Sequence, residues 1–376
     1  MRETPLLLFV VNDAGFFKSH RWQLAKAAQE AGYSVEIACP DDELINLFSK
    51  EGFIAHIVPF TRKNINPIYE IKTIFGLWNL YKKLKPDLIH HITIKPVIYG
   101  GIISRIQRLP RVIFAITGLG YIFSLRSKKA AVVQAIVRKI YHFVLGYEKA
   151  FTIYQNPDDR KEIWGDANLS RNLIIRGSGV DQTQFNYSCE SDELPIVGMA
   201  SRMLWSKGVG DFVEAAKRCR NNNISCRFVL IGDGDPGNPE SVPTLKLKQW
   251  NAEGIVEWWG KCTDMPDVLK KLHLVVLPTL YREGVPKVLI EAAATGRPLI
   301  GTDMPGCREI IQNNKNGMLI PPGDINALVT AISDLVNKPE KRRVMGLNSR
   351  ELFLSEFTLE HVISNTLELY KSLFAN

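Results

Sequence analysis

Residues 274–300 read LVVLPTLYREGVPKVLIEAAATGRPLI, and this stretch predicts the fold class of the chain. An apolar strand, Leu274–Leu277, leads through a short loop into a helix over Pro286–Thr295, and a second strand follows over Pro298–Gly301. A proline suits the first turn of a helix, and Gly296 suits the position just after its end. Strand–helix–strand order of this kind predicts a parallel sheet covered by helices.

Short apolar runs and longer helical patterns alternate along the whole chain. In the first half, we expect strands at Leu6–Val11, Val35–Ala38, Ala55–Val58, Leu88–His91, Val112–Ile116, Phe151–Tyr154 and Leu173–Ile175. In the second half, we expect further strands at Pro195–Ala200, Arg227–Ile231, Ile255–Trp258 and Met318–Ile320. The helical patterns cover Arg21–Ala31, Ile71–Leu84, Gly208–Arg220, Ile325–Val336 and Leu359–Phe374. Both halves therefore read as α/β structure.

A polar segment, residues 181–192, interrupts this pattern before it restarts. We therefore expect two doubly wound, Rossmann-like α/β domains, residues 1–188 and 189–357, that face each other across a cleft. A length of 376 residues agrees with two domains rather than one. Residues 358–376 form a helix that can pack on either domain, including back on the N-terminal one.

The net charge is concentrated in one part of the chain. The sequence holds 47 Lys and Arg against 39 Asp and Glu, a formal net charge of +8. Residues 51–150 contain 16 basic and 4 acidic residues, whereas the remainder contains 31 and 35. This asymmetry favours a phosphate-bearing substrate, an anionic membrane surface or nucleic acid, with a solvated basic face as the alternative. Residues 126–149 predict a basic amphipathic helix that either lies on a membrane or packs in the core.

Composition excludes several classes of protein. Hydrophobic residues make up 45% and charged residues 23%, as in ordinary globular proteins. No apolar run approaches the ~20 residues of a membrane-spanning helix, and the N-terminal MRETPLLLFVV is predicted to be a buried strand rather than a signal peptide. The 6 cysteines include no C-x-x-C pair, so they indicate neither zinc nor a redox dithiol, and we expect reduced cytosolic thiols.

The most informative motif runs from Glu283 to Glu291. The start of the helix exposes backbone N–H groups of Gly284, Val285 and Lys287, which suit a diphosphate. Glu283 lies at the loop–helix junction, where it can face a ligand. Glu291 lies on an otherwise apolar helix and needs a hydrogen-bonding partner, such as a ribose diol. Two surface carboxylates are the alternative.

A second motif, Arg202–Gly208, follows the strand at Pro195–Ala200. Arg202 gives planar bidentate contacts and Lys207 a mobile point charge, so together they can neutralise a diphosphate. The alternative is a pair of solvated loop charges.

The first half contributes candidates at the ends of its strands. Gly15 follows the first strand and would let the backbone approach a ligand, although no G-x-G-x-x-G fingerprint is present. His20 and Arg21 either cap a helix or line an acceptor site. Lys95 is a candidate for an anionic acceptor.

Two further features concern neighbouring strands. Thr117 and Gly118 open the stretch Thr-Gly-Leu-Gly-Tyr, whose glycines indicate close backbone approach. His90 and His91 are adjacent on a strand and face opposite ways, so they do not form a metal pair.

Taken together, these residues resemble glycosyltransferase family 4, retaining enzymes with the two-domain GT-B fold. The glutamates at 283 and 291, the Gly232–Asp235 step and the closing Ile320–Asp324 carry the likeness. The first half, through Ile89–Gly100 and neighbouring motifs, resembles the branch that extends polyprenyl-diphosphate-linked glycans in bacterial capsule, O-antigen and protein-glycan assembly.

The resemblance implies a role for each motif residue. Glu283 contacts the donor sugar, Glu291 binds the nucleotide ribose, and Arg202 and Lys207 hold the leaving diphosphate. Backbone groups at Gly284, Val285 and Pro286 assist, and Gly15 lies against the donor phosphates. No metal or other cofactor is implied. Many members of the family carry a His just before the Gly-Leu-Gly step, where this chain has Thr117.

The implied function is retaining transfer of a sugar, here expected to be an N-acetylhexosamine from a UDP-sugar, onto a polyprenyl-diphosphate-linked saccharide. The implied place is the cytoplasmic face of the plasma membrane, as a peripheral enzyme bound to anionic lipid. A nucleotide-sugar 2-epimerase and a non-catalytic nucleotide-sugar-binding protein are the alternatives. No recognition motif supports a nucleic-acid partner.

Overall fold

The computed structural model describes residues 4–61, 67–120, 123, 127–167 and 170–375. The chain forms two compact units: Met1–Ser178 with Val362–Asn376, and Gly179–His361. The sequence pattern places the boundary after residue 188, ten residues too late. The Val180 N–H donates to the Phe357 carbonyl at 3.1 Å, and the Leu359 N–H donates to the Val180 carbonyl at 2.9 Å. These backbone bonds tie the segment after Ser178 to the second unit.

The first unit is built on a seven-stranded sheet in the order β3-β2-β1-β4-β5-β6-β7. Its strands are β1 (Leu6–Val11), β2 (Ser34–Cys39), β3 (Ile54–Ile57), β4 (Leu88–Ile92), β5 (Val112–Ile116), β6 (Ala150–Tyr154) and β7 (Asn172–Ile174). All neighbouring strands pair in parallel. Each predicted strand of this half is present, with ends that differ by at most one residue.

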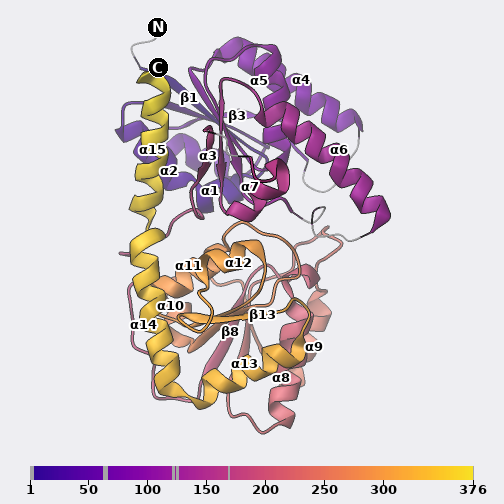
Figure 1. The fold of residues 1–376 in the computed structure, drawn as a ribbon, viewed down its shortest axis with the longest axis vertical. Helices are drawn as coiled ribbons and strands as arrows, with labels where there is room; N and C mark the ends of the chain where they lie inside the picture. The colour runs from indigo at the N-terminus through magenta and orange to yellow at the C-terminus, as the bar shows by residue number, and fades with distance from the viewer. Residues whose placement is uncertain (1–3, 62–66, 121–122, 124–126, 168–169, 376) are drawn as a thin grey trace. The chain divides into compact units, whose positions relative to one another are not determined.

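Helices cover both faces of this sheet. They are α1 (Ala14–His20), α2 (Trp22–Glu30), α3 (Leu44–Lys50), α4 (Pro67–Leu84), α5 (Gly101–Ile106), α6 (Lys128–Leu145) and α7 (Pro157–Trp164), with a π-helical turn at Pro96–Gly100. One core cluster packs α1, α2, α3 and α15 (Leu359–Ala375) on one face, and another packs α4, α5, α6 and α7 on the other. Figure 1 shows α2 and α15 to one side of the strands and α4, α5 and α6 to the other.

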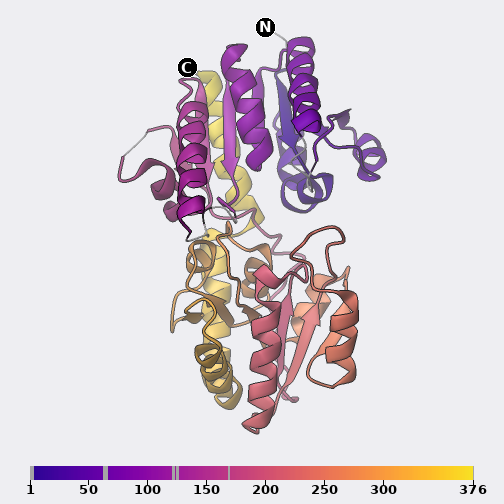
Figure 2. The same ribbon diagram turned by 90° about the vertical axis from the view of Figure 1, so that its right-hand side faces the viewer.

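The second unit contains a six-stranded parallel sheet in the order β10-β9-β8-β11-β12-β13. Its strands are β8 (Ile196–Ala200), β9 (Arg227–Ile231), β10 (Glu257–Gly260), β11 (Leu274–Leu277), β12 (Leu299–Thr302) and β13 (Gly317–Ile320). The helices are α8 (Val209–Asn221), α9 (Thr244–Ala252), α10 (Met265–Lys271), α11 (Lys287–Ala294), α12 (Pro305–Ile310), α13 (Ile325–Asn337) and α14 (Pro339–Glu356), with a 3₁₀ turn at Trp205–Lys207. Figure 2 shows strands flanked by helices in each unit.

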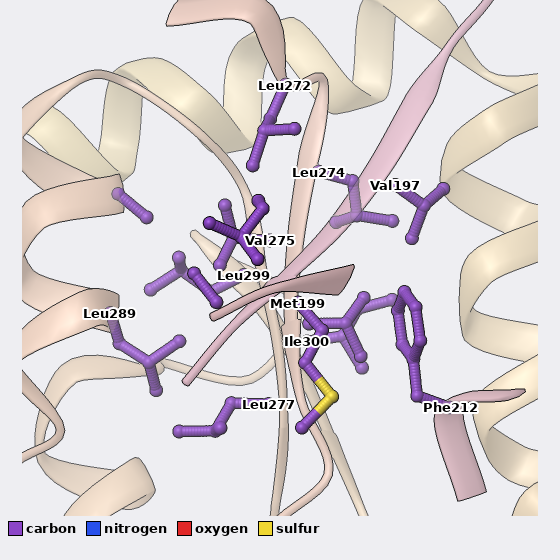
Figure 3. Close-up of a cluster of buried hydrophobic side chains, with 14 of the residues drawn as sticks. Val197, Met199, Phe212, Leu272, Leu274, Val275, Leu277, Leu289, Leu299 and Ile300 are labelled. Atoms are coloured by element: carbon purple, nitrogen blue, oxygen red, sulfur yellow. The ribbon is translucent and has the colours of Figure 1, made fainter. Parts of the chain in front are cut away.

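The core of the second unit combines aliphatic side chains of the strands with aromatic ones from the flanking helices, such as Phe212 and Phe353. Val197, Val275 and Ile300 of three neighbouring strands are fully buried. Figure 3 shows Phe212 of α8 and Leu289 of α11 on opposite sides of these strands. The sheet is therefore wound on both faces, as the strand–helix–strand order predicts.

The C-terminal helix α15 belongs to the first unit from Val362 onward. Its Tyr370 is fully buried, and the Tyr370 hydroxyl lies 2.6 Å from His90 Nδ1. The Leu373 carbonyl accepts a hydrogen bond from Arg111 Nε at 2.6 Å. Of the two arrangements that the sequence allows, the helix adopts the one on the N-terminal domain.

Within the part of the chain that the structure describes, none of the helices combines the length and apolar character needed to cross a membrane.

Candidate functional site

Two loops meet where the strand order of the second unit reverses. β8 and β11 are neighbours in the sheet, and the chain winds outward from them in opposite directions. In doubly wound sheets, ligands bind beyond the carboxyl ends of the strands at this switch point. Lys207 follows β8 and Glu283 follows β11, so the topology itself brings the two predicted motifs together.

Lys207 Nζ and Glu283 Oε2 form an ion pair, and both side chains are only 13% exposed. Gly208 explains how the loops come so close. Its φ is +81°, and a Cβ there would lie 2.0 Å from the Pro278 carbonyl oxygen. The Leu280 N–H also donates to the Ser206 carbonyl at 2.8 Å. The pair is thus held by backbone contacts between the two loops.

The environment keeps Lys207 charged. Burial by itself disfavours the ammonium, but the neighbouring Glu283 and Tyr281 side chains outweigh burial and raise the pKa of Lys207 above its ordinary value. The ammonium lies 5.2 Å from the centre of the Tyr281 ring. Burial, the larger cause, and the charge of Glu283 raise the pKa of Tyr281. The site therefore presents a fixed cation beside a neutral phenol.

Glu283 has hydrogen-bonding capacity to spare. Its Oε1 is buried and has no hydrogen-bond partner among the described residues. A buried acceptor without a donor is costly, so such an atom suits a ligand hydroxyl. The backbone here is also fixed closely: a Cβ on Gly306, in α12, would lie 1.8 Å from the Gly284 carbonyl oxygen.

Helix α11 begins one residue later than expected, because Pro286 is its N-cap rather than its first-turn residue. Pro286 has no N–H, so only Gly284, Val285 and the first helical residues can offer donors to an anion. Gly296 has a φ of +80° just beyond the helix end, as the sequence predicts.

Glu291 lies on α11 and is 8% exposed. Lys287 Nζ is 3.4 Å from Glu291 Oε1, one helical turn away. Burial raises the pKa of Glu291, and the charge of Lys287 offsets this only in part. The sequence predicts a partner for this carboxylate, such as a ribose diol, and the structure adds Lys287.

Arg202 has a partner that the sequence analysis missed. Arg202 Nη1 donates to Asp235 Oδ2 at 2.7 Å, and the Arg202 side chain is 48% exposed. Asp235 ends the Gly232–Asp235 step, which follows β9 beside β8. Asp235 follows β9 and Arg202 follows β8, so the sequence could have indicated this pairing through the adjacency of the two strands.

In the first unit, the candidates near β1 are not all open to a ligand. Gly15 is the second residue of α1 rather than a loop residue, and it is exposed. The His20 ring stacks on Phe16 with centroids 4.1 Å apart. Arg21 is 5% exposed, and burial lowers the pKa of its guanidinium to about 10. Because Arg21 is a buried cation of the core, it is not positioned to line an open acceptor site.

Lys95 is likewise engaged. Its Nζ lies 2.5 Å from Glu70 Oε1 and donates to the Thr61 carbonyl at 2.7 Å. Burial alone raises the pKa of Glu70, but hydrogen bonds from Lys95 and Tyr99 outweigh it and lower the pKa. Glu70 neutralises much of the charge that Lys95 was expected to offer to an anion.

The adjacent histidines face opposite ways, as expected. His91 Nε2 lies 2.8 Å from the Tyr81 hydroxyl on one face of the sheet, whereas His90 contacts Tyr370 on the other. Burial lowers the pKa of His91 to about 3 and also lowers that of His90, so both rings are neutral.

The first unit has a switch point of its own, between β1 and β4. Thr93 follows β4 with a φ of +73°, which is strained for a β-branched residue. Its hydroxyl donates to Asn12 Oδ1, after β1, at 2.6 Å. Sequence reasoning missed this pair, although Thr93 lies in the Ile89–Gly100 motif. Gly118 follows β5 with a φ of +120°, and Thr117 precedes it, partly buried.

The described residues contain no group of three or more His, Cys, Asp or Glu side chains that could hold a metal ion. All six cysteines are free thiols. Burial raises the pKa of Cys307, which lies close to Glu283, to about 12, so this thiol is neutral.

Two family models match the chain, one in each unit. The model described as glycosyl transferase 4-like matches residues 6–156, and the model described as glycosyl transferases group 1 matches residues 194–338. The chain is a family 4-like glycosyltransferase. Its fold is GT-B, and the family and fold that the motifs predict are confirmed.

Two curated relatives align with this glycosyltransferase over nearly its whole length. The N,N'-diacetylbacillosaminyl-diphospho-undecaprenol alpha-1,3-N-acetylgalactosaminyltransferase of Campylobacter jejuni is 26% identical over 371 residues, covering 95% of this chain and 96% of the relative. The UDP-Gal:alpha-D-GlcNAc-diphosphoundecaprenol alpha-1,3-galactosyltransferase of Escherichia coli is 26% identical over 363 residues, covering 92% and 90%.

Solved structures share the fold at lower identity. The Anabaena protein HepE, in complex with UDP and glucose, superposes with a TM-score of 0.78 at 17% identity over 97% of this chain and 99% of its own. Sucrose-phosphate synthase from Thermosynechococcus elongatus gives a TM-score of 0.78 at 19% identity, over 99% of both chains. These likenesses establish the architecture of the glycosyltransferase.

Proposed function

We propose that this glycosyltransferase moves an N-acetylhexosamine from a UDP-sugar onto a polyprenyl-diphosphate-linked saccharide, with retention, at the inner face of the cytoplasmic membrane. Two relatives that align over nearly the whole chain support the acceptor class, because both are named for diphospho-undecaprenol-linked sugars. One of them is named an N-acetylgalactosaminyltransferase, which supports an N-acetylhexosamine donor.

The observation that carries the proposal is the buried pair of Lys207 and Glu283 at the switch point of the second unit. Within the part of the chain that the structure describes, Glu283 Oε1 accepts no hydrogen bond, and a hydroxyl of the donor sugar would supply one. The Lys207 ammonium, already charged and fixed, would lie beside the diphosphate. In this pair, Glu283 would thus bind the sugar of the donor and Lys207 would bind its diphosphate.

The leaving diphosphate gathers negative charge as the bond from its oxygen to the sugar C1 breaks. Lys207, Arg202 and the N-terminal end of α11 supply positive potential at that place without reorganising. Arg202 can reach a ligand, since its side chain is half-exposed. Electrostatic stabilisation of the departing group is therefore the main catalytic contribution of these residues.

Glu291 would accept hydrogen bonds from the ribose hydroxyls. Its carboxylate is almost fully buried and lies 3.4 Å from Lys287 Nζ. A ribose diol would add two donors to an anion that burial disfavours.

Retention follows from departure and attack on the same face of the sugar. The electron pair of the C1–oxygen bond goes to the diphosphate, and the acceptor hydroxyl forms the new bond to C1. The hydroxyl proton passes to the departing phosphate oxygen, so charge and atoms balance. Both relatives are named for alpha linkages, which supports this stereochemistry.

A donor panel with a synthetic polyprenyl-diphosphate-sugar tests the proposal. The purified enzyme is incubated with different UDP-sugars, and the acceptor mass is measured. We expect the acceptor to gain one N-acetylhexosamine, and Glu283→Gln to abolish most of that gain. Incubation with donor alone is the control: an isomerised nucleotide sugar without acceptor would instead identify an epimerase.

A further inference from the structure

The helices α4, α5 and α6 form a continuous layer over one face of the first unit's sheet. α4 packs on α5, and α5 packs on α6, and Figure 1 shows the three together on one side of the strands. α4 follows β3 and α6 follows β5, so the first turns of both helices lie at the carboxyl edge of this parallel sheet.

The first half of α4 turns one carboxylate and one hydroxyl inward. Glu70 is 8% exposed and Thr73 is 1% exposed. Glu70 is held by Lys95 at 2.5 Å, and the Thr73 hydroxyl donates to the Pro59 carbonyl at 2.5 Å. These contacts fix the rotation of the helix about its axis.

That rotation leaves apolar side chains outward. Ile71 is 65% exposed, Phe75 is 64% exposed and Ile74 is 38% exposed. On α6, Val132 is 62% exposed and Ile136 is 55% exposed. A helix that buries a carboxylate and a hydroxyl on one face, and exposes isoleucine and phenylalanine on the other, suits an apolar neighbour. We call these five exposed side chains of α4 and α6 the apolar rim: Ile71, Ile74, Phe75, Val132 and Ile136.

The charges around the apolar rim have one sign. The residues 67–84, 101–106 and 128–145 contain eight basic residues and a single acidic one, Glu70, which is buried and paired with Lys95. Lys72 and Lys129 are exposed beside the rim. Cationic and apolar side chains on the same outer face are typical of helices that lie in an anionic bilayer surface.

We propose that the apolar rim inserts into an anionic lipid bilayer, with Ile71, Phe75 and Val132 below the headgroups and Lys72 and Lys129 among them. A second copy of the chain is disfavoured on this face, because two cationic layers would repel each other. This inference rests on the proposed function only for the identity of the lipid-linked acceptor. It places the carboxyl edge of the first unit's sheet at the membrane surface, where such an acceptor carries its diphosphate.

Vesicle flotation tests the proposal directly. The full-length enzyme is mixed with vesicles of phosphatidylcholine, with or without phosphatidylglycerol. We expect binding only with phosphatidylglycerol, and partitioning of Ile71→Ser/Phe75→Ser reduced by about tenfold or more. The matched control is Val344→Ser/Leu347→Ser, which changes two side chains of α14 that are 55% and 52% exposed, and should bind like the wild type.

A second variant, Lys72→Gln/Lys129→Gln, removes charge without touching apolar contacts. We expect its binding to weaken and to lose part of its dependence on salt. Equal binding of both rim variants and the wild type would overturn the proposal. So would a stable dimer that the serine variant dissociates.

Transfer kinetics separate this inference from the proposed function. The serine rim variant should raise KM for a long-chain acceptor in vesicles but keep wild-type kcat/KM for a short-chain, water-soluble acceptor. Loss of both activities would contradict an interfacial role for the rim. A wild-type enzyme that binds vesicles but transfers no sugar would instead refute the proposed function alone.

Discussion

Replacing Lys207 by methionine tests the donor site. The Lys207 and Glu283 side chains are each 13% exposed, and none of the described residues donates a hydrogen bond to Glu283 Oε1. Lys207→Met keeps most of the side-chain volume but leaves Glu283 buried without its cation. Breaking a buried pair from one side costs about 3–5 kcal/mol, so we expect the free energy of unfolding to fall by about 3 kcal/mol at neutral pH.

The catalytic effect should be separable from the loss of stability. Loss of one preorganised charge typically costs about 2.7–4 kcal/mol in the transition state, or about 10²–10³-fold in kcat. The double variant Lys207→Met/Glu283→Gln removes both charges and should recover much of the lost stability, because no buried charge is left alone. It should recover none of the activity.

The assays are urea unfolding and steady-state transfer with a soluble acceptor. Lys217→Met is the matched control, since Lys217 is exposed on α8 and lies outside the site. Wild-type kcat/KM for Lys207→Met would refute the assigned role. If the double variant were as unstable as Lys207→Met, the loss of stability would not come from leaving the Glu283 carboxylate buried without its cation.

Three other predictions concern separate parts of the molecule. Burial raises the pKa of Glu291, so its negative charge lowers the stability at pH values above the ordinary carboxyl pKa and not below it. Glu291→Gln should therefore raise Tm at neutral pH, have little effect on Tm below about pH 4, and weaken UDP binding about tenfold by calorimetry. Tyr370→Phe removes the 2.6 Å contact with buried His90 and should lower the unfolding free energy by about 1–3 kcal/mol in urea, whereas an unchanged midpoint would contradict the docking of α15. Transfer should persist in excess EDTA, and its loss, restored by a divalent cation, would overturn metal independence.

Much of the fold could be predicted because local pattern and topology agree. Leu6–Val11, Val112–Ile116, Arg227–Ile231 and Leu274–Leu277 are strands with the ends expected from their apolar runs. Fully buried parallel strands leave a continuous apolar signal, and the loops that follow them converge at one edge.

The partners of charged residues could not be predicted in the same way. Glu70 and Lys95 lie on different elements, and nothing in the periodicity of α4 indicates that its carboxylate turns inward. Arg21 begins the predicted helix Arg21–Ala31 but is buried beside α15, whose docking depends on contacts far along the chain. Such pairings are set by tertiary packing, which a local pattern does not encode.

The proton NMR spectrum of the product made from UDP-N-acetylhexosamine and a polyprenyl-diphosphate-sugar tests retaining transfer directly. Retaining transfer at the Lys207–Glu283 site predicts one added N-acetylhexosamine in an α linkage. A β linkage would contradict the same-face mechanism, and an unmodified acceptor with every hexosamine donor would contradict the proposed transfer itself.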